Sequence, residues 1–292
     1  MYRPVSAKND IQNTPLSRWA RLIYLFVAVN ALAGAAILMF LPGQTGALFF
    51  WPVNPAINAG LFGALYLGGA AVVFWAAARN LWEPSRFLVP ILVTAGVGIS
   101  AVTLLHLDSF AGGARVVYWL LIYMGAPLLA LLVYAHQERK GASWQVSAPV
   151  RPLTRWIAIV TGAIVAIAGV FLLLSPQAVI PYWPWQTSPL MVRIFAAWFV
   201  AFGAGLLWFN VERDWQRLKQ IPNLMIAASA LDLLMVFLYR DQIAQIDFTL
   251  GVYCAHLVLF GVAALAMHVI QYRASATYEA SRVTALPNHS LK

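Results

Sequence analysis

The chain has 292 residues, of which 62% are hydrophobic and 10% are charged, and its formal net charge is +9. Soluble domains contain roughly 45–50% apolar and about 25% charged residues, so this composition excludes an ordinary soluble domain. Several uninterrupted apolar runs reach the roughly 20 residues that a membrane-spanning helix needs. The composition therefore predicts an all-α integral membrane protein.

Eight apolar runs are expected to cross the membrane as helices, because every backbone amide in hydrocarbon must be paired within the protein. Lipid-facing barrel strands would instead alternate polar and apolar residues. The sixth run is the shortest, and its limits are the least defined. In chain order the runs cover about 22–41, 57–78, 88–106, 116–135, 156–175, 194–210, 221–239 and 249–271.

The basic residues predict the orientation of these spans. Sixteen of the nineteen lysines and arginines lie in alternate connecting segments, namely 1–21, 79–87, 136–155, 211–220 and 272–292. By the positive-inside rule these segments are cytoplasmic, which predicts a multi-pass protein of the cell membrane with both termini inside. The positive charge is then expected to meet anionic lipid headgroups, and nucleic acid is not expected as a partner.

Two further features limit the class of protein. The first apolar run is too long, and starts too far from the N-terminus, for a cleavable signal peptide, so we interpret it as a retained anchor helix. The single cysteine, Cys254, excludes an internal disulfide and a multi-cysteine metal site. Nucleotide-loop, zinc-protease and hydrolase motifs are absent from the sequence. No cofactor or metal is predicted, and an enzyme is the less favoured class.

The second half of the sequence repeats features of the first. Trp51-Pro52 recurs as Trp183-Pro184 and Pro90 recurs as Pro222, with most offsets at 132 to 134 residues. Each repeat holds four spans, so both repeats have the same orientation and a pseudo-two-fold axis along the membrane normal is expected. The expected parts are an N-terminal segment 1–21, a first four-helix unit 22–140, a linker 141–154, a second unit 155–273 and a tail 274–292.

Two ionisable residues lie inside the last two spans. Asp232 lies eight residues before Arg240, and His256 lies eight residues after Phe248. Both are therefore roughly 12 Å deep and at matching heights on neighbouring helices. An ionisable residue in a span is a functional-site hypothesis, and we expect these two residues to bind a ligand or a proton as a pair. A hydrogen bond that only fixes packing is the alternative.

A second set of candidates lies in the segments predicted to face outward. These residues balance in charge and are expected either to line a vestibule or, as we favour, to form ion pairs that orient the loops. They are His106, Asp108, Arg115, Arg193, Arg240, Asp241 and Asp247. The tryptophans of the outer loops, Trp51, Trp183 and Trp185, are expected to anchor the loops at the headgroup level.

Three functions remain open. The first is the binding or transport of a small neutral or lipophilic molecule, with proton coupling through Asp232 and His256. The second is a non-catalytic subunit or scaffold, whose partner would be another membrane protein or a second copy of the chain. The third, given the least weight, is an enzyme acting on a lipid or quinone. A cavity lined by Asp232 and His256 would favour the first function, and a solid bundle would favour the second.

Overall fold

The computed structural model describes residues 14–140, 146, 148–243 and 248–284. This part of the chain contains eight helices that are long and apolar enough to cross a membrane, which confirms the predicted class and the number of spans. The eight helices are α1 (Arg18–Phe40), α3 (Ala56–Arg79), α4 (Leu88–Leu105), α5 (Ala114–Lys140), α6 (Pro152–Leu174), α8 (Pro189–Leu207), α10 (Gln220–Leu238) and α11 (Phe248–Thr284).

Short helical turns connect the long helices. Three are α-helical: α2 (Thr45–Leu48), α7 (Pro176–Val179) and α9 (Trp215–Leu218). Six are 3₁₀ turns: η1 (Pro42–Gln44), η2 (Glu83–Ser85), η3 (Leu107–Ser109), η4 (Ile180–Tyr182), η5 (Trp208–Asn210) and η6 (Arg240–Gln242).

Local sequence explains where several helices begin and end. Ser17 caps α1 by accepting a hydrogen bond from the amide of Ala20, and Ser188 caps α8 in the same way, with Pro189 as the first helical residue. Asn80 ends α3 in the left-handed conformation that asparagine tolerates. Helix α11 continues to Thr284, through residues that were predicted to belong to a tail, because no proline or glycine interrupts 274–284.

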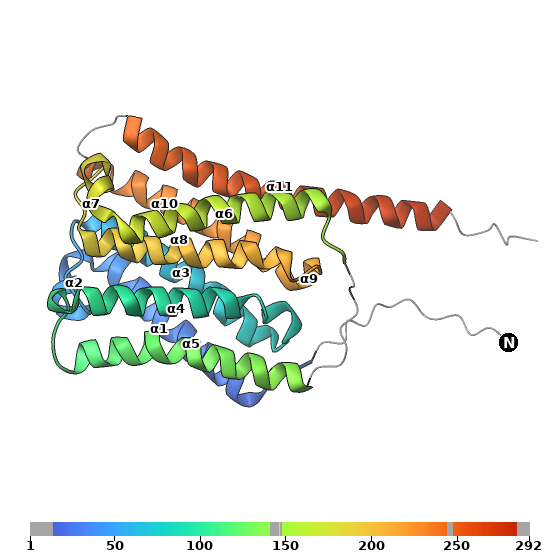
Figure 1. Ribbon diagram of the computed structural model, residues 1–292, viewed down its shortest axis with the longest axis horizontal. Helices are drawn as coiled ribbons and strands as arrows, with labels where there is room; N and C mark the ends of the chain where they lie inside the picture. The colour runs from blue at the N-terminus through green and yellow to red at the C-terminus, as the bar shows by residue number, and fades with distance from the viewer. Residues whose placement is uncertain (1–13, 141–145, 147, 244–247, 285–292) are drawn as a thin grey trace, which may run out of the picture.

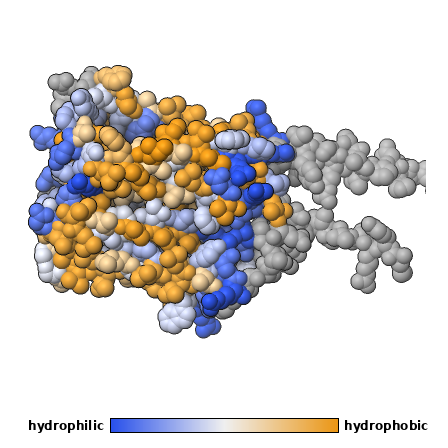
Figure 2. Space-filling model, viewed as in Figure 1, coloured by the Kyte–Doolittle hydropathy of each residue, from blue (hydrophilic) through white to orange (hydrophobic). Residues whose placement is uncertain are grey.

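The long helices lie side by side in one bundle (Figure 1). Helices α3 and α8 are central, with 61% and 67% of their spans buried, whereas only 17% is buried in α6 and in α11. Below, the Arg18 end and the Phe40 end of the bundle are named after the two ends of α1. In the view of Figure 2, hydrophobic residues cover much of the middle of the bundle, and hydrophilic residues gather toward its ends.

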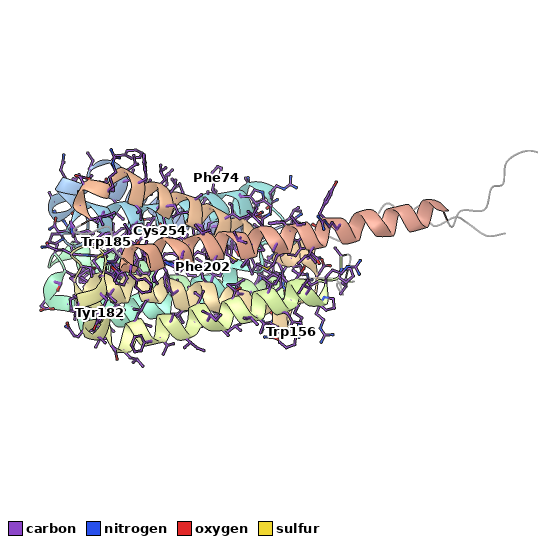
Figure 3. All side chains as sticks on the ribbon, turned by 90° about the horizontal axis from the view of Figure 1, so that it is seen from above. Phe74, Trp156, Tyr182, Trp185, Phe202 and Cys254 are labelled. Atoms are coloured by element: carbon purple, nitrogen blue, oxygen red, sulfur yellow. The ribbon has the colours of Figure 1, made fainter. Side chains whose placement is uncertain are left out.

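Six helix pairs form the body of the bundle. Helix α1 packs on α3, α6 on α8, α4 on α5, and α10 on α11; in addition α4 packs on α8, and α10 on α3. Small residues permit the closest approach: a Cβ at Gly203 of α8 would lie 2.6 Å from the Cβ of Ala166 of α6. The lipid-facing surface carries large side chains instead, such as Phe74 and Trp156, which are 57% and 64% exposed (Figure 3).

Candidate functional site

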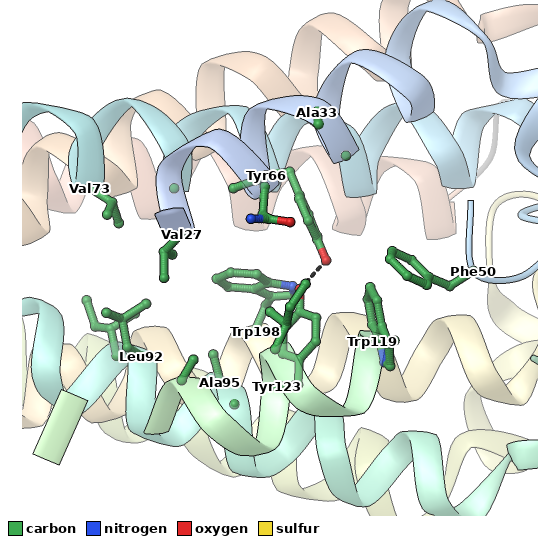
Figure 4. A pocket seen from close by; sticks show the side chains of 18 of the residues that line it. Val27, Ala33, Phe50, Tyr66, Val73, Leu92, Ala95, Trp119, Tyr123 and Trp198 are labelled. Carbon is green, nitrogen blue, oxygen red and sulfur yellow. Dashed lines mark hydrogen bonds between the residues drawn. The ribbon is translucent and has the colours of Figure 1, made fainter. Parts of the chain in front are cut away.

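A cavity of about 350 Å³ lies among α1, α3, α4 and α5, within the zone that the helices span. Trp198 of α8 and Leu224 of α10 also line it. Its volume falls in the range of roughly 300–1,000 Å³ that is typical of small-molecule sites. Figure 4 shows the side chains around this space.

Small residues from four helices line the cavity, and at Gly69 the space in front of the backbone is open. Gly34 of α1, Gly69 of α3, Gly96 of α4 and Ala126 of α5 line the cavity. A Cβ at Gly69 would meet no atom within 4 Å, so the volume in front of this residue is not filled by a neighbouring helix. A stripe of small residues in a membrane span normally lets helices touch. At Gly69 it leaves a hollow.

Aromatic side chains form the wall of the cavity toward the Phe40 end. The rings of Phe50 and Trp119 have centroids 4.6 Å apart, and Phe49 lies edge-on to Trp119 at 5.8 Å. The indole nitrogen of Trp119 donates a hydrogen bond of 2.8 Å to Thr103 and is therefore satisfied. This wall is rigid and apolar.

Two hydroxyl groups and one indole nitrogen supply most of the polarity in the middle of the cavity. The hydroxyls of Tyr66 on α3 and Tyr123 on α5 are hydrogen-bonded to each other. Trp198 lies edge-on to Tyr66, with ring centroids 6.3 Å apart. Its Nε1–H is buried and has no hydrogen-bond partner among the described residues. Asp, Glu, Lys, Arg and His are absent from the lining, so the cavity suits an uncharged molecule.

Two residues of the cavity lining are exposed at the molecular surface: Leu48 of α2 is 47% exposed and Tyr118 of α5 is 43% exposed. One hydrogen bond joins α5 to α1 here, from the Tyr118 hydroxyl to Oδ1 of Asn30. The Asn30 amide nitrogen donates to the carbonyl of Phe26 on its own helix, at 2.8 Å. Tyr118 lies in the membrane-spanning part of α5, so this exposed part of the lining faces the zone that lipid would occupy.

Asp232 and His256 do not form the expected pair. In the described part of the chain, neither a hydrogen bond nor an ion pair joins them, and neither lines the cavity. The imidazole of His256 instead lies beside the rings of Tyr253 and Phe199, at 4.9 and 5.7 Å between centroids. Asp232 is 6% exposed, and its Oδ1 has no partner. The depth estimate did not fix which side of each helix these residues occupy.

The outward-segment candidates are only partly brought together. Arg193 donates a hydrogen bond of 2.8 Å to His106 and another of 2.9 Å to the carbonyl of Leu173. Arg115 reaches the carbonyl of Gly46 at 3.4 Å, and Arg240 reaches that of Phe237 at 3.3 Å.

The acidic members of this set do not complete the expected ion pairs. Asp108 and Asp241 are exposed, and within the described chain neither is in an ion pair. Asp247 lies outside the described residues. The outward set is therefore one hydrogen-bonded pair, His106 with Arg193, beside separate residues.

The tryptophans expected to anchor the loops are mostly packed inside the protein. Trp51 and Trp185 are each 2% exposed. Trp51 lies edge-on to Trp119 at 5.1 Å, and Trp185 donates a hydrogen bond of 2.8 Å to Asn58. Trp183 is partly exposed and stacks with Phe195. The anchoring prediction is wrong for Trp51 and Trp185, because Trp51 packs against rings of α3 and α5 and Trp185 contacts α3 and α11.

Sequence reasoning missed a network of buried charges at the Arg18 end. Arg217 contacts Glu83 at 2.5 Å and Glu212 at 2.8 Å, while Arg86 contacts Glu212 and Glu138, both at 3.0 Å. These five residues come from η2, α9, the end of α5 and the segments beside them. Their sequence signal was weak: Glu83, Glu138 and Glu212 are three of six acidic residues that lie in the segments rich in basic charge.

Comparisons of the chain with protein-family models, with curated proteins and with solved structures found no match. The geometry of the site therefore carries the functional argument. Among the described residues, no group of three or more His, Cys, Asp or Glu side chains is arranged to hold a metal ion.

Proposed function

We propose that this chain is a multi-pass protein of the cell membrane that binds a small, neutral, lipophilic molecule, which enters from the bilayer between α1 and α5. The observation that carries this proposal is the cavity of about 350 Å³ with a largely apolar lining, which is exposed at Tyr118 in the membrane-spanning part of α5. An uncharged occupant fits because no charged side chain lines the cavity to compensate a buried charge.

The proposal includes the internal duplication, which allows each position that lines the cavity to be compared with its counterpart in the second unit. Gln137 accepts a hydrogen bond from the amide of Ser17 and donates one to the carbonyl of Pro15. Gln271, 134 residues later, does the same with Arg151 and Pro149. The sequence separations within the two sets are identical, at 120 and 122 residues. Such matching contacts support two four-helix units, within 22–140 and 155–273.

The aromatic contacts support the same alignment. Trp82 lies edge-on to Tyr134 as Trp215 does to His268, at offsets of 133 and 134 residues. In the same way, the edge-on contact of Trp51 with Trp119 has its counterpart in that of Trp185 with Tyr253. These contacts pair Trp51 with Trp185, and not with Trp183 as the Trp-Pro motif suggested.

Helix packing follows the proposed repeat as well. The contacts of α1 with α3 and of α4 with α5 recur as α6 with α8 and α10 with α11. Across the units, α4 packs on α8 and α10 packs on α3. This exchange is what a pseudo-two-fold axis along the bundle produces, because each unit presents the same two helices to the other.

In this frame, aromatic rings fill the second unit where the first unit is hollow. Gly69 of α3 corresponds to Phe202 of α8, and Ala126 of α5 corresponds to Phe260 of α11, at offsets of 133 and 134. The rings of Phe202 and Phe260 meet edge-to-face at 5.4 Å. The same frame therefore tolerates a packed interior, and small residues at both positions of the first unit create the cavity. We take this difference as support for a binding role.

We also propose that the Arg18 end faces the cytoplasm, so that both termini are cytoplasmic. The support is the count of basic residues: sixteen of nineteen lie in the segments 1–21, 79–87, 136–155, 211–220 and 272–292. The opening between α1 and α5 would then be reached from within the bilayer.

The proposal is tested by filling the cavity with the ring that the second unit uses. The purified protein in detergent micelles would be equilibrated with durene (tetramethylbenzene), and uptake would be compared with that of empty micelles. We expect saturable uptake by the wild type and its loss in Gly69→Phe, because the new ring enters open space.

Gly125→Phe is the matched control for this experiment. Gly125 also has no atom within 4 Å of a Cβ, but it does not line the cavity. This variant should take up durene as the wild type does. Equal uptake by the wild type and Gly69→Phe, or no saturable uptake by the wild type, contradicts the proposed function.

A further inference from the structure

The polar groups of the cavity are unevenly divided between donors and acceptors. Trp198 contributes an indole N–H, which can donate but cannot accept. This N–H is buried and has no partner among the described residues. In Figure 4 the nitrogen-bearing side of its ring is turned toward the Tyr66–Tyr123 hydrogen bond. A buried donor without a partner costs free energy comparable to a lost hydrogen bond, so a ligand that accepts from it relieves this cost.

The tyrosine pair adds a second donor at the same height. Two hydroxyls carry two protons, and the hydrogen bond between Tyr66 and Tyr123 uses one of them. The remaining proton is free to rotate toward a ligand. Asn30 and Tyr118 are hydrogen-bonded to each other, and Asn30 also donates to a carbonyl of its own helix. The second N–H of Asn30 is available as well, but Asn30 is only partly buried, so this donor can be left unpaired at a lower cost than the Trp198 N–H.

The two cavity tyrosines are replaced by apolar residues in the filled unit. In the proposed repeat, Tyr66 corresponds to Phe199 and Tyr123 corresponds to Leu257, so the filled unit has no hydroxyl at either position. The two polar groups and the hollow are thus found together, although either could be present without the other.

We infer that the ligand is a neutral lipophilic molecule with a hydrogen-bond-accepting oxygen, of the ketone, quinone or ester type, held by Trp198 and the Tyr66–Tyr123 pair. This inference rests on the proposed function and specifies its ligand class. Helices of both units take part, because Trp198 comes from α8 while the tyrosines come from α3 and α5. The apolar wall formed by Phe50 and Trp119 receives the hydrocarbon part of the ligand.

The test compares two probes with the same ring and methyl groups. Durene has no oxygen, and duroquinone (tetramethylbenzoquinone) has two carbonyl oxygens. Both are measured by their equilibrium partition between protein-containing and empty detergent micelles, which removes their different solubility in the micelle. We expect wild-type protein to prefer duroquinone about tenfold, the effect of one or two neutral hydrogen bonds.

Two variants remove the donors while keeping an aromatic ring at each position. Trp198→Phe and the double variant Tyr66→Phe/Tyr123→Phe are each expected to lower the preference for duroquinone about threefold to fivefold, with durene uptake retained. Trp183→Phe is the matched control, because the Trp183 N–H is also buried and unpartnered but lies outside the cavity lining. It should leave the preference unchanged. Testing two positions keeps the inference falsifiable if one variant does not fold.

The outcomes separate this inference from the proposed function. Saturable uptake of durene together with an equal affinity for duroquinone would overturn the acceptor-bearing ligand and leave the binding cavity in place. A preference that persists in both Trp198→Phe and Tyr66→Phe/Tyr123→Phe would overturn it too. Failure of the wild type to take up either probe would instead refute the proposed function.

Discussion

Arg193, on α8, donates a hydrogen bond of 2.8 Å to Nε2 of His106, the residue that follows α4. Because a guanidinium can only donate, the imidazole must be neutral at this nitrogen. Burial, followed by the charge of Arg193, holds the pKa of His106 below its ordinary value of 6.5, although Asp108 opposes this shift.

This contact predicts a loss of stability in acid. Below about pH 6.5 the unfolded chain binds a proton at His106 more readily than the folded chain does, so the free energy of unfolding falls as the pH falls. Between pH 7.5 and 5.5 we expect the melting temperature of wild type to fall about 1 °C further than that of His106→Gln, which keeps an acceptor but does not titrate. Equal pH dependence of the two proteins would contradict this account.

The buried charge network predicts a large effect from the loss of one arginine. Arg217→Gln removes the cation beside Glu83, whose side chain is only 4% exposed. Leaving a buried carboxylate uncompensated costs about 3–5 kcal/mol in the free energy of unfolding. Denaturant titration of purified protein measures this loss. Arg213→Gln, at an exposed arginine of the same segment, should change stability by less than about 0.5 kcal/mol.

A double variant checks the pairing in this network. Adding Glu83→Gln to Arg217→Gln removes the stranded charge, so the combined loss should be smaller than the sum of the two single losses. Additive losses would show that Glu83 and Arg217 act independently, against the 2.5 Å contact between them.

The glutamines of the proposed repeat predict two independent losses of similar size. Gln137→Ala and Gln271→Ala each remove two matching hydrogen bonds to the segment before α1 or α6, at a cost of about 1–2 kcal/mol in the free energy of unfolding, and Gln271→Ala also removes the bond from Thr154. Their effects should add in the double variant, because the hydrogen bonds of the two glutamines involve different segments of the described chain. Arg139→Ala, at an exposed residue near Gln137, serves as the control. A loss confined to one glutamine would contradict equivalent roles.

Close packing of α6 on α8 predicts opposite effects for two glycine substitutions. A Cβ at Gly203 would lie 2.6 Å from the Cβ of Ala166, so Gly203→Ala should destabilise the protein by about 1–3 kcal/mol. At Gly251 of α11 a Cβ meets no atom within 4 Å, and Gly251→Ala should stabilise the helix by about 0.5–1 kcal/mol. Thermal unfolding compares them; a destabilised Gly251→Ala or a neutral Gly203→Ala would be inconsistent with this packing.

Replacing Asp232 tests whether this residue, which the sequence indicated as a binding site, takes part in ligand binding. Its Oδ1 is buried without a partner and lies outside the cavity lining. Replacing an unsatisfied polar group by an apolar one of similar shape is nearly neutral or stabilising, so Asp232→Leu should unfold within about 1 kcal/mol of the wild type or later. Durene uptake should not change. A loss of uptake would restore Asp232 as a binding residue.

The small residues that create the cavity are visible in the sequence, but nothing in the sequence distinguishes them from ordinary helix-packing residues. Gly69 and Ala126 resemble the small residues that usually let membrane helices touch. Only their comparison with Phe202 and Phe260, aligned through the contacts of Gln137 and Gln271, reveals two positions at which volume is missing. The predicted site at Asp232 and His256 was instead based on depth, which the sequence does report.

Class, number of spans and approximate helix limits could be deduced from sequence, because hydrocarbon imposes its requirement on each segment separately. A run of about 20 apolar residues must become a helix wherever it lies in the bundle. The rotation of each helix about its own axis depends on its neighbours. Within the described chain, that rotation leaves Asp232 and His256 without a hydrogen bond or ion pair to each other, and it brings Tyr66 of α3 and Tyr123 of α5 together. The way the connecting segments pack at the Arg18 end likewise decides that Arg86 and Arg217 share Glu212. The contacts between side chains and the position of the cavity are therefore decided by how the helices pack together.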